Sequence, residues 1–237
     1  MKISILTLIL SIAGTFIFGQ SKIPGCEQLS RQEVAKLFTD SLNQELQITF
    51  PIFKVFKCKD KTGQFYIVLT ESNDLISPDQ DTLNTSIKAF NFYKDNSGYI
   101  KKWELFDFKT RQAVSDEMES SIWFWSKYAE FKDIDHDNEI DPVIIYGTSG
   151  MNGTEDGRIK IFIFYKGQKH AIRHQNGVLD FERNTKVNKT FYSLPVKIQD
   201  HVKQIMEKLT DDGHAIFPYG WQTAMKEEKL FFDENKK

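Results

Sequence analysis

The chain contains 237 residues, of which 40% are hydrophobic, 20 are Phe and only six are Pro. This length can form one large domain or two small ones with a proper core, and so aromatic-rich a composition argues against intrinsic disorder. The formal net charge is −2, and no stretch resembles a basic patch for phosphates. The composition therefore gives no reason to expect binding to nucleic acid or to anionic lipid.

Residues 1–20, MKISILTLILSIAGTFIFGQ, have the layout of a secretory signal peptide. The single early charge of Lys2 precedes an apolar run over Ile3–Phe18, and small and polar residues follow. This predicts cleavage near residues 19–21 and export to the periplasm, the outer membrane or the medium. An uncleaved membrane anchor is the alternative, but the run is short for a span and no cluster of positive charge follows it. A lipoprotein would use Cys26, which polar residues separate from the run.

Cys26 and Cys58 are expected to form a disulfide. An exported protein meets an oxidising compartment, and no CxxC spacing indicates a catalytic pair. A bridge would close a loop of about thirty residues and stabilise the fold by roughly 3 to 4 kcal/mol. The alternative is two unpaired thiols.

The first half of the mature chain is predicted to form a helix and two β-hairpins. Residues 30–46 carry apolar side chains at helical spacing, and Ser30 with Glu33 forms a capping box. The segments that follow are rich in β-branched and aromatic residues, and they predict strands at 46–58, 64–71, 87–94 and 99–109, with turns at 60–63 and 95–98 and a polar loop at 72–85. Pro51 indicates that the first strand lies at an edge or carries a bulge.

The second half is predicted to add more sheet and a second helix. The acidic segment 115–135 could form either strand or helix in its middle. Two strong strands, 141–148 and 158–167, flank a glycine-rich segment, and 170–175 may extend the sheet. Residues 194–209 have the pattern of an amphipathic helix that starts with Pro195, and the charged tail from Lys226 is expected to fray.

No repeat period and no linker divides the chain. The sequence therefore predicts a single exported domain over 21–237, of the α+β class, dominated by antiparallel β-sheet. An N-terminal helix and a C-terminal amphipathic helix complete this expected architecture.

Aspartates occur at 133, 135, 137 and 141, directly before an apolar strand. Carboxylates so close together repel each other, so the loop is either fully solvated or balanced by a cation. Calcium takes about six to eight oxygen ligands, which alternate side chains on a tight turn can supply. The predicted ligands are the side chains of Asp133, Asp135, Asp137 and Asp141 and the carbonyl of Glu139, whose side chain would point to solvent. Asn138 occupies the usual glycine position and tolerates positive φ.

This loop resembles an EF-hand only in its first nine positions, because the twelfth is Ile144 and not a bidentate Glu. It more closely resembles the DxDxDGxxD calcium loops between β-strands of FG-GAP (integrin-type) and similar secreted repeats, and it departs from them at the glycine. It also partly resembles a DxNxDGxxD-type turn of exported lysozyme inhibitors. Its single copy argues against a propeller. The resemblance implies an ion that pins two strands together, whereas a lectin-like site would need open coordination positions.

The segment 170–183 concentrates polar residues that could line a carbohydrate or peptide cleft: His170, Arg173, His174, Gln175, Asn176, Asp180, Glu182 and Arg183. Two histidines four residues apart could instead bind zinc from a helix face, but the segment follows a strand and lacks an HExxH glutamate. An ordinary structured surface is the remaining interpretation.

The aromatic residues of IWFWSKY are Trp123, Trp125 and Tyr128. Exposed rings stack on sugars, but aromatic residues at alternate positions of a strand are more often core. Trp221 is expected to pack in the same way. Ser149 is flanked by glycine but lacks the GxSxG elbow of a serine nucleophile.

Most of the mature chain resembles a small family of exported proteins, common in Bacteroidetes, that are labelled surface polysaccharide biosynthesis proteins. The segments that carry the resemblance are FPIFKVF, KKWELFDF, SIWFWSKY, DIDHDNEIDPVIIYGT, DGRIKIFIFY, AIRHQNGVLDFERNT and AIFPYGW. The label implies a link to the cell envelope and transfers no catalytic residue.

These observations support three hypotheses about function. The first is a non-enzymatic, calcium-stabilised envelope protein that binds glycan or an envelope protein and no nucleic acid, without a transmembrane span in the mature chain. The second is an enzyme acting on surface polysaccharide, with its site near 170–183. The third is an inhibitor of a wall-degrading enzyme such as lysozyme.

Overall fold

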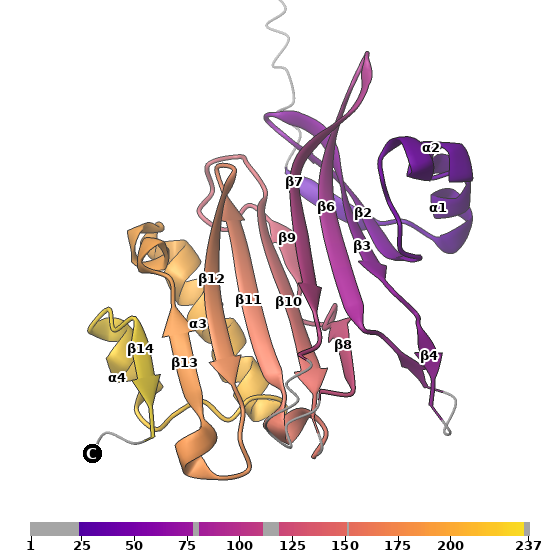
Figure 1. Cartoon of the computed structure of the whole chain (residues 1–237). Helices are drawn as coiled ribbons and strands as arrows, with labels where there is room; N and C mark the ends of the chain where they lie inside the picture. The colour runs from indigo at the N-terminus through magenta and orange to yellow at the C-terminus, as the bar shows by residue number, and fades with distance from the viewer. Residues whose placement is uncertain (1–23, 78–80, 111–118, 151, 235–237) are drawn as a thin grey trace, which may run out of the picture.

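The computed structural model describes residues 24–77, 81–110, 119–150 and 152–234. Two antiparallel β-sheets pack face to face, and helices cover the outer face of each sheet, so that the layers run helix, sheet, sheet, helix (Figure 1). The predicted α+β class with mostly antiparallel sheet is confirmed. The expected signal peptide, residues 1–20, lies outside the described residues.

The N-terminal sheet has five strands in the order β1-β2-β3-β6-β7. Their bounds are β1 Gly25–Gln28, β2 Ile52–Asp60, β3 Gly63–Glu71, β6 Ser86–Asp95 and β7 Gly98–Phe108. Both predicted hairpins are present, and the pairing of β2 with β3 is irregular between Ile52 and Lys54, next to Pro51. The expected loop 72–85 contains a short hairpin of its own, β4 (Leu75–Ile76) with β5 (Thr82–Leu83).

The C-terminal sheet runs in the order β14-β13-β12-β11-β10-β8, and β9 also pairs with β10. The bounds are β8 Ser121–Phe124, β9 Glu130–Lys132, β10 Asp141–Ser149, β11 Arg158–Tyr165, β12 Gln168–Gln175, β13 Asn184–Val187 and β14 Phe231–Asp233. The ambiguous segment before the acidic loop therefore forms strands, and 170–175 extends the sheet as expected.

The predicted N-terminal helix is interrupted. α1 (Arg31–Leu37) has the capping box of Ser30 and Glu33, but Phe38 leaves the helical conformation and is buried. Thr39 then caps α2 (Asp40–Glu45), its Oγ1 accepting a hydrogen bond from the backbone N–H of Leu42. The apolar spacing continues across this break, which is why the sequence alone predicts one helix.

The C-terminal amphipathic helix is confirmed as α3 (Val196–Asp211), with Pro195 just before its first residue. Its buried face is formed by Ile198, Val202, Ile205, Met206 and Leu209. A further short helix, α4 (Trp221–Lys226), was not predicted. The expectation that the tail frays from Lys226 is wrong for Phe231–Asp233, because β14 pairs with β13 at the sheet edge.

Three hydrophobic clusters fill the spaces between the four layers. One lies between α1–α2 and the N-terminal sheet, around Phe38, Tyr66 and Phe90. The second lies between the sheets, where Ile67 and Leu69 of β3 share a core with Ile144 and Tyr146 of β10. The third lies between the C-terminal sheet and α3–α4. Both faces of each sheet are therefore at least partly covered, which accounts for strands such as β3 and β10 that are buried along most of their length.

Candidate metal centre and adjoining cavity

The acidic loop connects β9 to β10 at one end of the sandwich. His136 and Asn138 both adopt positive φ, 68° and 69°, and so bend the chain sharply. Asp133 accepts hydrogen bonds from the backbone N–H groups of Asp137 (3.0 Å) and Asn138 (3.0 Å). The carboxylates therefore order the turn themselves, and Asn138 adopts the left-handed conformation that was expected of it.

Three of the predicted ligands converge. Carboxylate oxygens of Asp133, Asp135 and Asp141 lie within 4.8 Å of one another, so this cluster could hold a metal ion. Asp141 is only 2% exposed, and burial, together with the negative charges of Asp135 and Asp137, raises the pKa of its carboxyl to about 7. A cation would favour the ionised form of all three groups, and a set of oxygen donors suits a hard cation.

The other two predicted ligands are oriented differently. Asp137 forms ion pairs with Lys166 (3.2 Å) and Lys61 (3.8 Å), and Glu139 forms one with Lys61 (3.2 Å). Although burial opposes it, a backbone hydrogen bond from Glu139 and the two lysines lower the pKa of Asp137. The Glu139 side chain therefore does not simply point to solvent, as the sequence had suggested. The lysines come from two β-turns distant in sequence, so no local pattern could have revealed them.

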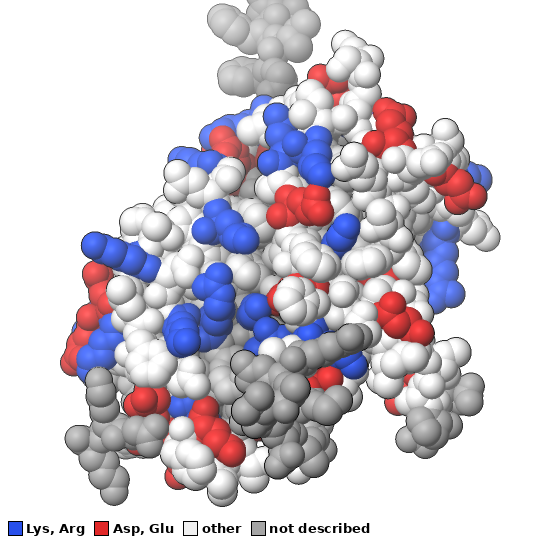
Figure 2. Space-filling view, in the orientation of Figure 1, with Lys and Arg blue, Asp and Glu red and all other residues white. Residues whose placement is uncertain are grey.

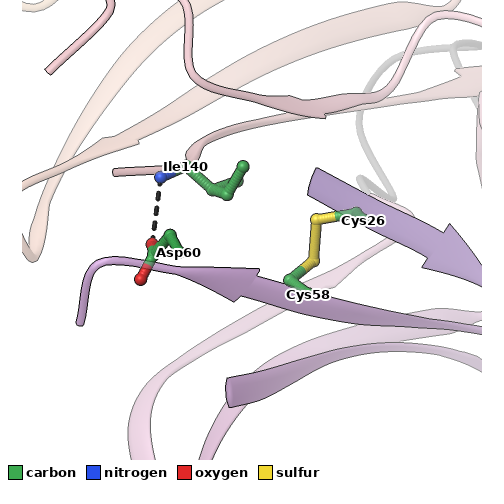
Figure 3. Close-up of a disulfide and its surroundings, with 4 residues drawn as sticks. All are labelled: Cys26, Cys58, Asp60 and Ile140. Atoms are coloured by element: carbon green, nitrogen blue, oxygen red, sulfur yellow. Dashed lines mark hydrogen bonds between the residues drawn. A yellow bond between two sulfur atoms is a disulfide. The ribbon is translucent and has the colours of Figure 1, made fainter. Parts of the chain in front are cut away.

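The loop is attached to both sheets and to α3. Ile140 donates its backbone N–H to Asp60 Oδ2 at the end of β2 (3.0 Å), as Figure 3 shows beside the disulfide. Tyr165 of β11 donates its hydroxyl to Asp135 Oδ2 (3.1 Å), and Lys197 of α3 donates to the Asp135 carbonyl (3.2 Å). The position of this loop therefore depends on elements from all parts of the described chain.

The predicted disulfide between Cys26 and Cys58 is present. It joins directly opposed residues of β1 and β2, 32 positions apart in sequence, and Cys58 is fully buried in the core between the sheets (Figure 3). The bridge fixes β1 at the edge of the N-terminal sheet, on the strand that ends at Asp60. It thus supports the same strand end that holds the acidic loop.

A cavity of about 510 Å³ opens between the two sheets beside the acidic loop. Trp103 of β7, Tyr93 of β6 and Phe164 of β11 supply aromatic surface, and the ring of Trp103 stacks on Phe164 with centroids 3.8 Å apart. The polar part of the lining comes from Asp60, Thr62, Asn91, Lys102, Glu139 and Lys166. Its size and mixture of rings and polar groups are those of a small-molecule site.

Asn91 is a polar group on the otherwise apolar inner face of β6. It is buried, lines the cavity, and its Oδ1 has no hydrogen-bond partner among the described residues. Such an acceptor is costly to leave unpaired, and a hydroxyl or water that enters the cavity would satisfy it. None of the aromatic or amide residues around the cavity had been singled out from the sequence, because alternation alone does not show which inner positions remain uncovered.

The segment 170–183 does not form one cleft. His170 and His174 lie on the helix-covered face of β12 and are buried, whereas Arg173, between them in sequence, points to the opposite face of the sheet. Four residues along a strand span roughly 13 Å, too far for the two histidines to share a zinc ion. The zinc alternative therefore has no geometric support.

The remaining residues of this segment are mostly engaged in structural contacts. His174 hydrogen-bonds to Thr185 Oγ1 (2.9 Å) and Asn176 Oδ1 (2.8 Å), and Gln175 donates to the carbonyls of Asp156 and Asn176. Arg183 donates to Asp180 and to the carbonyls of Gly177 and Val178. These contacts hold the loops after β12 and explain the polarity of the segment without a ligand.

The aromatic residues that were weighed against sugar binding belong to the core. Trp125 and Tyr128 are buried against α3, Trp221 is buried beside Phe217, and Trp123 packs partly against the same cluster. Packing is therefore the correct interpretation of all four.

Comparison of the chain with protein-family models, curated proteins and solved structures finds no match in any of the three. Among the helices that the structure describes, none combines the length and the apolar character needed to cross a membrane.

Proposed function

We propose that this chain is an exported cell-envelope protein that binds carbohydrate in the cavity between its sheets and is stabilised by calcium at the acidic loop. The observation that carries the proposal is the cavity, where the rings of Trp103 and Tyr93 adjoin the unpaired amide oxygen of Asn91. Sugars present apolar ring faces and hydroxyl donors, which match aromatic surface and a free acceptor. The leader-like N-terminus, the disulfide and the resemblance to polysaccharide-linked exported proteins support the envelope location.

Calcium is the proposed ion because every donor in the cluster is a carboxylate oxygen. Asp133, Asp135 and Asp141 would supply side-chain ligands, and backbone carbonyls and water would complete the coordination that calcium prefers. The ion would supply positive charge where three carboxylates now face one another. The loop would then hold Glu139 and Ile140, which line the cavity, in a fixed position.

Calcium titration of the mature protein by calorimetry tests the metal centre. We expect one ion to bind, and a calcium concentration about 100-fold above Kd to stabilise the fold by roughly 2.7 kcal/mol relative to EDTA. Asp135→Asn should abolish both effects, whereas Asp180→Asn, at an exposed carboxylate outside the loop, should change neither. Absence of binding heat in the unmodified protein would show that the loop is only a solvated acidic turn.

A screen of soluble oligosaccharides, read by calorimetry, tests the cavity. Trp103→Ala should weaken binding of any oligosaccharide that gives saturable binding by at least about tenfold, because it removes the aromatic surface of the site. Phe106→Ala is the matched control, since Phe106 lies on the same strand, is 53% exposed and does not line the cavity. Melting temperatures would confirm that both variants fold. Equal affinity of the two variants would contradict the assignment of the cavity.

A further inference from the structure

One cross-strand row of the C-terminal sheet continues past the edge of the N-terminal sheet. The pairing registers place six residues side by side on the same face, in the order Phe124, Tyr146, Lys160, Arg173, Lys186 and Phe231. Phe124 and Tyr146 lie in the core between the sheets. The same face must therefore carry Lys160, Arg173, Lys186 and Phe231, because residues opposite each other in an antiparallel sheet point to one side.

The N-terminal sheet covers this row only as far as β11. Its edge strand β7 contacts β11 through the ion pair of Asp107 with Lys160 (2.5 Å) and the stacking of Trp103 on Phe164. β12, β13 and β14 extend beyond β7 (Figure 1). Figure 2, in the same orientation, shows Lys and Arg side chains gathered over this part of the molecule. Lys186 and Phe231 are exposed and Arg173 is half-buried.

The cations beyond β7 lack counter-charges. Lys160 is neutralised by Asp107, whereas Lys169, Arg173 and Lys186 have no carboxylate within 4.0 Å among the described residues. Arg173 is held in place by a hydrogen bond to Asn188 Oδ1 (2.9 Å), and both Arg173 and Lys169 lie over the ring of Phe162. These contacts orient the positive charges and leave them available to an anion.

This cationic face, defined by Lys169, Arg173 and Lys186, is continuous with the cavity. Phe164, which lines the cavity, pairs directly with Lys169 across β11 and β12. Lys169 in turn covers Phe162, beside Arg173. A chain molecule with one sugar in the cavity would thus pass over the three cations as it leaves along the sheet.

We propose that the ligand is an anionic polysaccharide, one of whose sugars occupies the cavity while carboxylates of neighbouring sugars bind Lys169, Arg173 and Lys186. This inference rests on the proposed carbohydrate-binding function and specifies its ligand class. Nucleic acid fits less well, because it carries a phosphate at every residue and the cavity is bordered by Asp60 and Glu139. An acidic polysaccharide has sparser charges that can alternate with neutral, hydroxyl-rich units.

The test compares three ligands on the full mature chain in millimolar calcium: a hyaluronan hexasaccharide, a chitin hexasaccharide of equal length without charge, and an oligothymidylate. Calorimetry is run at about 50 and 300 mM NaCl, where screening differs strongly. The expected result is hyaluronan binding that is tighter than chitin binding and weakens with salt. Lys169→Gln/Lys186→Gln should weaken hyaluronan binding about tenfold and leave chitin binding unchanged. Both lysines are exposed and have no structural partner to lose.

Lys36→Gln/Lys226→Gln is the matched control, since it removes the same charge from exposed positions on the helices α1 and α4. An equal loss in this control would reduce the effect to net charge and overturn the proposal. Equal affinity for the two sugars, or oligothymidylate binding as strong as hyaluronan binding, would also overturn it. If neither sugar binds, the proposed carbohydrate function fails with it, whereas chitin binding alone leaves that function standing.

Discussion

At the scale of single residues, the buried histidine of β12 shows how a polar side chain can serve the fold alone. His174 is enclosed between Thr185 and Asn176, and the Asn176 amide also bonds to the carbonyls of Thr154 and His214 and to the N–H of Ile216. Burial lowers the pKa of His174 to about 4. The network therefore requires the neutral imidazole and ties two loops to the sheet.

This makes stability dependent on pH in a defined direction. The unfolded chain takes up a proton on this histidine near pH 6.5, but the folded chain does so only near pH 4, so stability is complete above 6.5 and is lost as the pH falls toward 4. Between pH 7 and pH 5 the free energy of unfolding should fall by about 2 kcal/mol from His174 alone. Urea unfolding in saturating calcium would measure it, with His174→Gln as reference. An identical pH slope in the two proteins would contradict the assignment.

At the scale of elements, the break between α1 and α2 decides how the helices cover the N-terminal sheet. Because the chain bends at Phe38, that ring enters the core and packs against Tyr66 with ring centroids 5.8 Å apart. One straight helix over 30–46 would carry the second half away from the sheet. The cap at Thr39 restarts the helix in the new direction.

Thr39→Ala should therefore lower the free energy of unfolding by about 1 kcal/mol, because the first turn of α2 loses its side-chain cap. Thr39→Ser keeps a capping oxygen and should stay close to the unmodified protein. Urea unfolding of the three proteins gives the comparison. A loss in the serine variant as large as in the alanine variant would mean that the threonine methyl group, and not the cap, stabilises the bend.

At the scale of the whole molecule, one end of the sandwich is fastened by three connections: the disulfide, the bond from Ile140 to Asp60, and the acidic loop. All three converge on the end of β2, where the cavity opens. Rigidity at this end is what a binding site between two sheets requires, since either sheet could otherwise shift against the other.

Cys26→Ser/Cys58→Ser should destabilise the protein by about 3 to 4 kcal/mol, because the unfolded chain gains the freedom of an open loop. Thermal unfolding under non-reducing conditions measures the change. If the disulfide and the ion support the same strand end, calcium affinity should also decline in this double variant. Unchanged calcium affinity would show that the two connections act independently.

Several features could be predicted from sequence because they depend on neighbours along the chain. Alternation and turn residues located the two N-terminal hairpins, and Pro195 with its apolar spacing located α3. The acidic loop was evident from the spacing of its aspartates, and Asn138 from its tolerance of positive φ. Local sterics and periodic burial act over a few residues, so these signals survive without any knowledge of the fold.

The tertiary structure decided the rest, because the relevant partners are far apart in sequence. Lys61 and Lys166 draw Asp137 away from the other carboxylates, and Trp103 meets Phe164 only when the sheets pack. A chain with a net charge of −2 and no basic run still assembles a cationic face, since strand pairing places single cations side by side. The sequence alone determined the elements and the acidic loop, whereas register and layering determined which side chains form the cavity and its cationic face.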